Sequence, residues 1–475
     1  CNMVAPMSTD VRMALLECLG IFVGLSGCIL IWIDHRQPGP YMDEIFHIPQ
    51  VKKYCSRNFY EWDPMITTLP GLYLSSIAVL EPVSWVFHAN LKAICVTFWL
   101  RFINIGFAAG NVVLLLLLCK KIHGRHKTFH HVNALLTALA LGIFPVLYFF
   151  TFLYYTDPGS TFFCLLTYLL GLQGYHLLGA LCGAISIIFR QTNIVWVMFT
   201  AASVVIDIVI DQVQPQKKDD SIKKDMNSLP WLLAVTKQLA TNRKTLWILC
   251  RTVARRLWSY IVVGVAFAAF IYVNGGIVVG AKTDHQACLH FPQVFYFVCV
   301  ACGFGVIHLP FQNVLDFPKD VRRKPKQYLF LMAVSFIAVW KFTYTHRYLL
   351  ADNRHYTFYI WQKVYQRHAL VKYALIPGYI FALWLVLHWV KHKNILWKIL
   401  FFMCVALQVV PQMLLEFRYF ILPYLILRLN MPLGSKPRLL GELLMYAAIN
   451  IFTLHMYMNK PFVWSHDNTV QRFMW

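Results

Sequence analysis

Long apolar segments alternate with short polar connectors along most of this 475-residue chain. The first apolar segment covers residues 13–33, and a second, uninterrupted one covers residues 98–119. A helix needs ~20 apolar residues to cross the hydrocarbon core of a bilayer, and both segments provide them. They predict transmembrane helices, and the first is too long and too uniformly apolar for the h-region of a cleavable signal peptide.

Later apolar segments are shorter and more often interrupted. Residues 132–211 contain several, separated by polar turns at residues 154–160 and 190–193. Further spans are expected near residues 258–280, 291–311, 328–344, 373–390, 395–411, 419–429 and 439–458. Residues 70–78 are too few to cross, so we expect an interfacial or re-entrant helix there. The pattern predicts an all-α polytopic membrane protein with about thirteen transmembrane helices.

The composition supports a membrane protein and argues against two other classes. Hydrophobic residues make up 59% and charged residues 13% of the chain, whereas a soluble domain carries about 25% charged residues. The net charge is +22, but the basic residues lie in short clusters between apolar segments. This distribution fits cytosolic loops and contacts with anionic lipid or phosphate, and it does not fit a nucleic-acid-binding protein.

The distribution of charge also assigns sides to the connectors. A basic run at residues 120–127 follows the second long span and is expected to be cytosolic. If residues 70–78 do not cross, the acid-rich loop at residues 34–69 lies on the opposite side, and so does the loop at residues 346–368. The chain is then expected to consist of a first module at residues 1–211, a cytosolic connector at residues 212–256 and a second module at residues 257–475.

Four of the 21 Asp and Glu residues lie within residues 43–63 of the loop at residues 34–69, namely Asp43, Glu44, Glu61 and Asp63. A glycosyl transfer that inverts the anomeric centre needs one carboxylate as general base, whereas a retaining double displacement needs two. Neighbouring residues point in different directions, so Asp43 and Glu44 cannot both face one substrate. We expect one to be the base and the other to pair with a cation or a sugar hydroxyl. A solvated pair at the membrane surface is the alternative.

Trp62 lies between two of these acids, Glu61 and Asp63. An aromatic face flanked by hydrogen-bond acceptors suits a sugar ring, although a tryptophan that anchors the chain at the membrane interface has the same sequence signature. We take Glu61, Trp62 and Asp63 as candidate substrate-binding residues.

Cations are unexpectedly frequent on the side of the acidic loop. The positive-inside rule predicts few there, yet residues 346–368 include Arg354 and His355, and Arg418 precedes a later span. Arg190 lies in an otherwise apolar region, where ionisable residues often mark a functional site. Because arginine offers a planar fork to phosphate oxygens, we expect these residues to bind a lipid phosphate. A solvated loop, snorkelling side chains and a polar hairpin turn are the alternatives.

We expect no cofactor and no metal ion. His47 lies three residues after Glu44, but it lacks a second ligand at a metal-binding spacing. Most of the 13 Cys lie in apolar segments, where a role as small hydrophobic residues is expected. Cys55 and Cys288 fall in connectors on the side of the acidic loop, where they could form a disulfide or remain free thiols.

Several longer motifs carry a resemblance to a known family. They are residues 41–50 (YMDEIFHIPQ), 62–73 (WDPMITTLPGLY), 189–193 (FRQTN), 273–278 (VNGGIV), 349–359 (LLADNRHYTFY), 415–420 (LEFRYF) and 471–475 (QRFMW). In these motifs the chain resembles the dolichyl-phosphate-glucose-dependent alpha-1,2-glucosyltransferases of the endoplasmic reticulum. The resemblance covers nearly the whole chain and is weakest at residues 212–242.

The resemblance implies a GT-C glycosyltransferase fold in the endoplasmic reticulum membrane, with the active site in luminal loops. It implies that glucose passes, with inversion, from dolichyl phosphate glucose to the 2-hydroxyl of the terminal glucose of Glc2Man9GlcNAc2-PP-dolichol. This is the last step in assembling the lipid-linked oligosaccharide for N-glycosylation. The catalytic acid of related enzymes falls on Asp43 and Glu44 here. A GT-C mannosyltransferase that uses dolichyl phosphate mannose and a membrane transporter remain alternatives.

Overall fold

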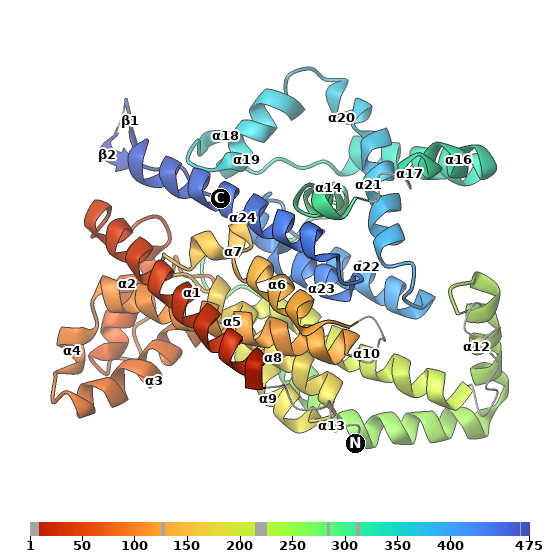
Figure 1. Ribbon diagram of the computed structural model, residues 1–475, viewed down its shortest axis with the longest axis horizontal. Coiled ribbons are helices and arrows are strands. Elements are labelled where there is room, and N and C mark those ends of the chain that lie inside the picture. The colour runs from red at the N-terminus through yellow and green to blue at the C-terminus, as the bar shows by residue number, and fades with distance from the viewer. Residues whose placement is uncertain (1–8, 125–128, 214–225, 283–285, 310–313, 466) are drawn as a thin grey trace.

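The structure, a computed structural model, describes residues 9–124, 129–213, 226–282, 286–309, 314–465 and 467–475, and these residues are mainly helical (Figure 1). The helices before the connector are α1 (Thr9–Arg36), α2 (Glu44–Cys55), α3 (Gly71–Val86), α4 (Leu91–Ile94), α5 (Thr97–His123), α6 (His131–Gly142), α7 (Pro145–Phe150), α8 (Asp157–Gln173), α9 (His176–Phe189), η1 (Gln191–Asn193) and α10 (Ile194–Val213).

The helices from the connector onward are α12 (Leu229–Thr241), α13 (Arg243–Asn274), α14 (Pro292–Phe304), η3 (Val306–His308), α16 (Asp316–Arg323), α17 (Pro325–Phe342), α18 (Arg347–Ala351), α19 (Tyr356–Ile360), η4 (Trp361–Tyr365), α20 (Val371–Ala374), α21 (Ile376–Trp389), α22 (Ile395–Val409), η5 (Phe417–Phe420), α23 (Ile421–Asn430) and α24 (Lys436–Asn459). A short antiparallel pair of strands, β1 (Phe462–Trp464) and β2 (Asp467–Gln471), follows α24.

The prediction of an all-α polytopic membrane protein is confirmed. Within the described residues, six helical segments are long and apolar enough to cross a membrane, and they lie in α1, α5, η1–α10, α13, α20–α21 and α24. Shorter apolar helices include α3, α6, α9, α14 and α22. The predicted number of about thirteen crossings includes helices that are shorter than these six segments. Interruptions between helices make some of these helices short; for example, α6 ends at Gly142 and α7 starts with Pro145.

Most expected spans coincide with helices, but two boundaries differ. α13 begins at Arg243, well before residue 258, because the Asn242 side chain caps it by accepting a hydrogen bond from the Thr245 amide at 3.0 Å. The basic end of the connector therefore continues directly into a span. α3 extends past the expected residues 70–78 to Val86, because the helix continues through Pro82, which removes only one backbone donor.

One hydrophobic core joins the parts of the chain before and after the connector. Its buried residues come from α1, α5, α6, α7, α8 and α10, and also from α14 and α21–α24. α24 packs against α6 and α7, and α22 packs against α10; Figure 1 shows α22 and α24 in blue, α6 and α7 in orange and α10 in yellow-green. Phe144 and Tyr424, for example, stack with ring centroids 4.8 Å apart. The two expected modules thus share one core.

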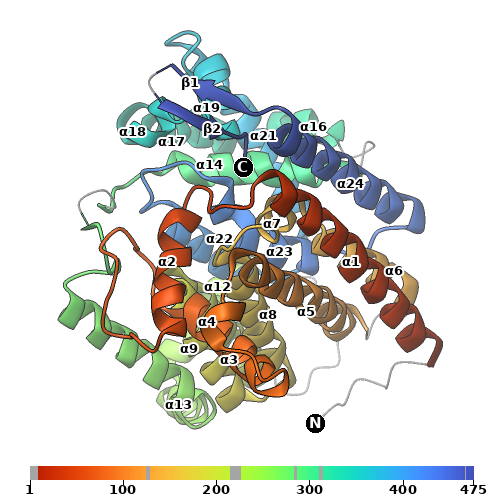
Figure 2. The ribbon, with the colours of Figure 1, turned by 90° about the vertical axis from the view of Figure 1, so that its left-hand side faces the viewer.

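The ends of α1 and α24 meet on one face of the molecule. Arg472 donates hydrogen bonds to the main-chain oxygens of Arg36, at the end of α1, and of Tyr457, in the last turn of α24. On the same face, Trp464 donates to the Asn353 side chain at 2.7 Å, and Figure 2 shows β1 and β2 beside α18 and α19. The acidic loop, the loop at residues 346–368 and the residues after α24 therefore lie together.

The suggested disulfide between Cys55 and Cys288 is wrong. Cys55 at the end of α2 forms a disulfide with Cys95, which follows α4, and Cys288 is free. α2 and α4 pack against α3, and both cysteines are buried in a satellite cluster with Ile48 and Val51. This packing brings Cys95, rather than a residue of the second half, to Cys55.

Candidate active site

A cavity of about 940 Å³ opens where the acidic loop at residues 34–69 meets the cation-bearing loop at residues 346–368. Its lining residues come from within residues 42–47, 65–68, 155–161, 190–195, 275–282, 348–357 and 407–422, together with Ala287. Both halves of the chain contribute. The carboxylates of the first loop and the cations of the second half, far apart in the sequence, therefore face one space.

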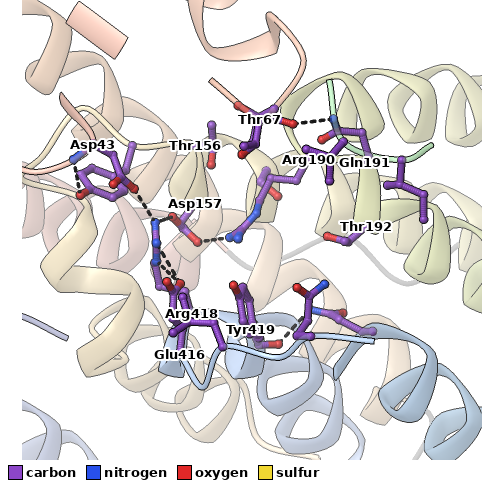
Figure 3. A pocket seen from close by; sticks show the side chains of 18 of the residues that line it. Asp43, Thr67, Thr156, Asp157, Arg190, Gln191, Thr192, Glu416, Arg418 and Tyr419 are labelled. Carbon is purple, nitrogen blue, oxygen red and sulfur yellow. Dashed lines mark hydrogen bonds and ion pairs between the residues drawn. The ribbon is translucent and has the colours of Figure 1, made fainter. Parts of the chain in front are cut away.

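Asp43 faces this cavity from the residue just before α2. Its side chain is 42% exposed, and its Oδ2 accepts a hydrogen bond from Arg418 Nη1 at 3.3 Å. The Asp43 amide donates to the hydroxyl of Tyr155 at 3.2 Å (Figure 3). The preceding Met42 has a φ of 55°, in the left-handed region, so the chain turns sharply before α2 and directs Asp43 toward the cavity.

Glu44 points the other way and is fully buried. Its carboxylate accepts hydrogen bonds from Arg101 at 2.9 and 2.6 Å, from the Tyr41 amide at 3.0 Å and from the Tyr154 amide at 2.6 Å. Arg101, on α5, is buried too and also donates to the main chain at Gln37. Of the two adjacent acids, Glu44 is therefore the partner of a cation, and it ties the acidic loop to the turn before α8.

Acids and cations alternate across the cavity wall. Arg418 contacts Asp43, bonds Glu416 at 2.8 Å and lies 3.9 Å from Asp157 Oδ2. Asp157 Oδ1 in turn accepts a hydrogen bond from Arg190 Nη1. Figure 3 shows the resulting row in the order Asp43, Arg418, Asp157, Arg190. Arg190 is thus separated from Asp43 by two side chains, whereas Arg418 lies beside it.

Arg354 and His355 also line the cavity. Arg354 makes a forked pair with Asp352, with both nitrogen–oxygen distances at 2.8 Å. His355 Nδ1 lies 2.7 Å from the main-chain oxygen of Trp475. The structure therefore brings together five of the predicted site residues, which are Asp43, Arg190, Arg354, His355 and Arg418.

The structure does not bring Glu61, Trp62 and Asp63 into the cavity. Glu61 is largely exposed and pairs with Lys53 at 3.1 Å, and Trp62 packs edge-on against the ring of Tyr73. Asp63 is used locally, because its Oδ1 accepts a hydrogen bond from the amide of Met65 at 2.9 Å. These residues shape the stretch that leads to Thr67 and Thr68, which do line the cavity.

No specific signal in the sequence pointed to Asp157, the most deeply buried carboxylate of the cavity. It lies at the first residue of α8 and is only 2% exposed. Its Oδ2 has no hydrogen-bond partner among the described residues. The signal available was an Asp-Pro pair in the polar turn at residues 154–160, which also fits an ordinary helix start. A buried oxygen that faces the cavity unbonded can accept a hydrogen bond from a ligand.

The charges around Asp43 favour its ionised form. Burial raises the pKa of its carboxyl group, but Arg418, His47 and His355 together lower it by more, and the net pKa lies below its usual value. Burial also lowers the pKa of His47, whose Nδ1 lies 2.6 Å from the Tyr73 hydroxyl, so His47 is neutral at pH 7. Asp43 is thus a carboxylate able to accept a proton.

The fixed charges of the cavity balance. In the described part of the chain, its lining includes four carboxylates (Asp43, Asp157, Asp352 and Glu416) and four permanent cations (Arg190, Lys282, Arg354 and Arg418). Within the described residues, no group of three or more His, Cys, Asp or Glu side chains is arranged to hold a metal ion.

Comparisons with known proteins show the family to which the chain belongs. The sequence model of the DIE2/ALG10 family matches residues 37–429. A protein of Rattus norvegicus named Dol-P-Glc:Glc(2)Man(9)GlcNAc(2)-PP-Dol alpha-1,2-glucosyltransferase is 46% identical over 92% of this chain and 93% of its own. Proteins of the same name from Homo sapiens and Arabidopsis thaliana are 46% and 34% identical, over 92% and 94% of this chain and 93% and 96% of their own. The chain belongs to the DIE2/ALG10 family.

Proposed function

We propose that this protein transfers glucose from dolichyl phosphate glucose to the 2-hydroxyl of the terminal glucose of Glc2Man9GlcNAc2-PP-dolichol, with inversion and an alpha-1,2 linkage. The names of relatives that align over more than nine-tenths of the chain support this reaction. The observation that carries the proposal is that the side chains of Asp43 and Glu44 point in different directions. Only Asp43 faces the cavity, and an inverting transfer needs one base.

Asp43 is the best-placed base among the cavity carboxylates. Its side chain is 42% exposed, whereas Asp157 is 2% exposed and Asp352 and Glu416 are each 16% exposed. Asp43 takes the proton of the acceptor 2-hydroxyl as the hydroxyl oxygen attacks the anomeric carbon of the donor glucose. The bond from that carbon to the phosphate oxygen breaks, and dolichyl phosphate leaves with the electron pair.

We assign the cations of the cavity two roles: one lies beside the candidate base, and the others are placed to bind the donor phosphate. In an inverting displacement the attacking hydroxyl and the leaving group lie on opposite sides of the anomeric carbon. Arg418 directly contacts Asp43, so it lies on the side of the base and keeps the carboxylate ionised. Arg190 lies beyond Asp157, which makes it the best-placed cation for the departing phosphate. Arg354 and His355 remain further candidates for phosphate binding, and a cation there stabilises the transition state more than the ground state.

The unpartnered Oδ2 of Asp157 lies between these two ends. It is available to accept a hydrogen bond from a hydroxyl of the transferred glucose, which must lie between the base and the phosphate. A hydrogen bond to a buried charged oxygen is among the stronger kinds.

The protein works at a membrane, as its apolar helices require. We propose that this is the membrane of the endoplasmic reticulum, with the cavity on the luminal side. The disulfide between Cys55 and Cys95 supports this placement, because disulfides form in oxidising compartments. The dolichyl chains of both substrates stay in the bilayer, and we propose that the reaction needs no cofactor and no metal ion.

A donor-swap assay tests the proposal. The purified protein, in lipid nanodiscs, is given labelled dolichyl phosphate glucose or dolichyl phosphate mannose, with Glc2Man9GlcNAc2-PP-dolichol or its one-glucose precursor as acceptor. We expect transfer only for the glucose donor with the two-glucose acceptor, and cleavage of the product by an alpha-1,2-specific glucosidase. Equal transfer from the mannose donor, or no transfer from the glucose donor, refutes the proposal.

A further inference from the structure

Residues 471–475 lie between the two loops that carry the candidate base and the candidate phosphate ligands. They begin at the last residue of β2, Gln471, and run across the face where α1 and α24 end (Figure 2). The family match ends at residue 429, and nothing above assigns these residues a role. Their contacts on each side are direct and mostly buried.

On one side, this segment holds the turn that leads to Asp43. The Tyr41 hydroxyl donates to the main-chain oxygen of Arg472 at 2.7 Å and accepts from the Arg472 amide at 2.8 Å. Tyr41 is 6% exposed, and its ring packs edge-on against that of Tyr457. The Tyr41 hydroxyl, two residues before the candidate base, therefore makes both of these hydrogen bonds with a single residue of the segment.

The Arg472 side chain anchors the contact between Tyr41 and Arg472 to the ends of α1 and α24. It donates to the main-chain oxygens of Arg36 at 2.7 Å, Tyr457 at 2.9 Å and Met458 at 3.3 Å, and to the Gln37 side chain at 3.0 Å. The carbonyls at helix ends lack partners within their own helices and carry partial negative charge. Arg472 therefore joins the ends of α1 and α24 while its main chain holds Tyr41.

On the other side, the segment holds the loop with Arg354 and His355. The Met474 amide donates to the Arg354 oxygen at 2.9 Å, and the Tyr356 amide donates to the Met474 oxygen at 3.1 Å. Arg354 Nη1 also donates to the Gln471 side chain at 3.1 Å. Trp475 packs edge-on against Phe417, the neighbour of Arg418.

We propose that Tyr41 and Arg472 are positioning residues, and that residues 471–475 fix the distance between the base and the cations of the loop at residues 346–368. Both groups must act on one glucose at the same moment. A displacement of ~1 Å in such an arrangement can cost ~100-fold in rate. This inference rests on the proposed function for its catalytic readout.

The test is Tyr41→Phe, which removes the hydroxyl and keeps the ring. The matched control is Tyr148→Phe, because Tyr148 is equally buried at 6% exposure and its hydroxyl bonds Ser26 at 2.9 Å, away from the cavity lining. We expect Tyr41→Phe to lower kcat by ~10-fold or more with KM for the donor changed by less than about 2-fold. Tyr148→Phe should keep kcat within about 2-fold of wild type at a similar loss of thermal stability.

Hydrogen exchange of the full-length protein gives a readout that does not need activity. Tyr41→Phe should speed amide exchange in residues 41–47 and also in residues 354–356, whereas Tyr148→Phe should leave both stretches unchanged. Arg472→Lys should have an intermediate effect, because one ammonium cannot reach all the oxygens that the guanidinium reaches. Faster exchange confined to residues 41–47, or equal kcat in the two Tyr→Phe variants, overturns the positioning role. Absence of glucose transfer by the wild type would instead refute the proposed function.

Discussion

Asp43→Asn and Glu44→Gln make the same chemical change at neighbouring residues, and we expect opposite consequences. Asp43→Asn keeps the size of the side chain but removes its ability to take a proton. A general base contributes ~10²–10⁴-fold to a rate, so turnover should fall by at least ~100-fold, which corresponds to ~2.7 kcal/mol of activation free energy. The folded state should be little affected, because the Asp43 side chain is partly exposed in the cavity.

Glu44→Gln should act on stability instead. The Glu44 carboxylate accepts four hydrogen bonds, and both it and the Arg101 guanidinium are 0% exposed. Removing one charge leaves Arg101 buried with its nearest counter-charge lost, and breaking such a pair typically costs ~3–5 kcal/mol. A double variant, Glu44→Gln with Arg101→Met, removes the stranded charge, so it should recover much of that loss.

Both variants are compared with wild type in the same nanodiscs, by thermal unfolding and by single-turnover glucose transfer. The expected pattern is an inactive but stable Asp43→Asn protein and a destabilised Glu44→Gln protein whose remaining folded fraction turns over. The reasoning fails if Glu44→Gln is as stable as wild type but inactive, because Glu44 would then take part in the chemistry. Near-normal turnover in Asp43→Asn would also refute it.

Three further predictions follow from the same structure. Arg418→Gln removes the cation that lowers the pKa of Asp43, so Asp43 should take up its proton at higher pH and the acid limb of the kcat/KM profile should move toward neutral; an unmoved limb would disprove the pairing. Chelation by EDTA should leave activity unchanged, and rescue of a chelator-inactivated enzyme by Mg²⁺ or Mn²⁺ would show that a metal ion is needed. Peptide mapping without reduction should find Cys55 linked to Cys95 and Cys288 alkylated, and any linkage to Cys288 would contradict the fold.

The helical fold was predictable because long apolar segments follow from the bilayer alone. Residues 13–33 and 98–119 become α1 and α5 for this reason. Boundaries that depend on local chemistry were less predictable. The cap at Asn242, for example, starts α13 within a stretch that reads as a polar connector.

The site was predictable only where charge itself was unusual. Asp43 stands out because it belongs to a cluster of acids in a chain with few of them, Arg418 because cations are unexpected on that side, and Arg190 because it lies in an apolar region. Glu61 meets the same criterion, yet it lies outside the cavity because it pairs with a lysine on the neighbouring α2. The sequence pattern records where charges occur and not the direction in which they point.

Features that depend on long-range packing gave no sequence signal. Arg101 lies in an apolar span, 57 residues from Glu44, and nothing local connects the two. Arg472 and Tyr41 are 431 residues apart. The choice of Cys95 as the partner of Cys55 likewise follows from how α2, α3 and α4 pack and not from the spacing of the cysteines.

The balance of charge in the cavity has a consequence for how the spent carrier leaves. The donor is a phosphodiester with one negative charge, whereas dolichyl phosphate is a monoester with nearly two at neutral pH. In the proposed reaction Asp43 takes the acceptor proton, so the four cations among the described lining residues then face three carboxylates, and we expect this excess to hold the more highly charged product. Release then requires Asp43 to pass its proton to water. The pKa of Asp43 is lowered, so loss of its proton to water is favoured. We expect dolichyl phosphate to leave the cavity together with this loss of the proton.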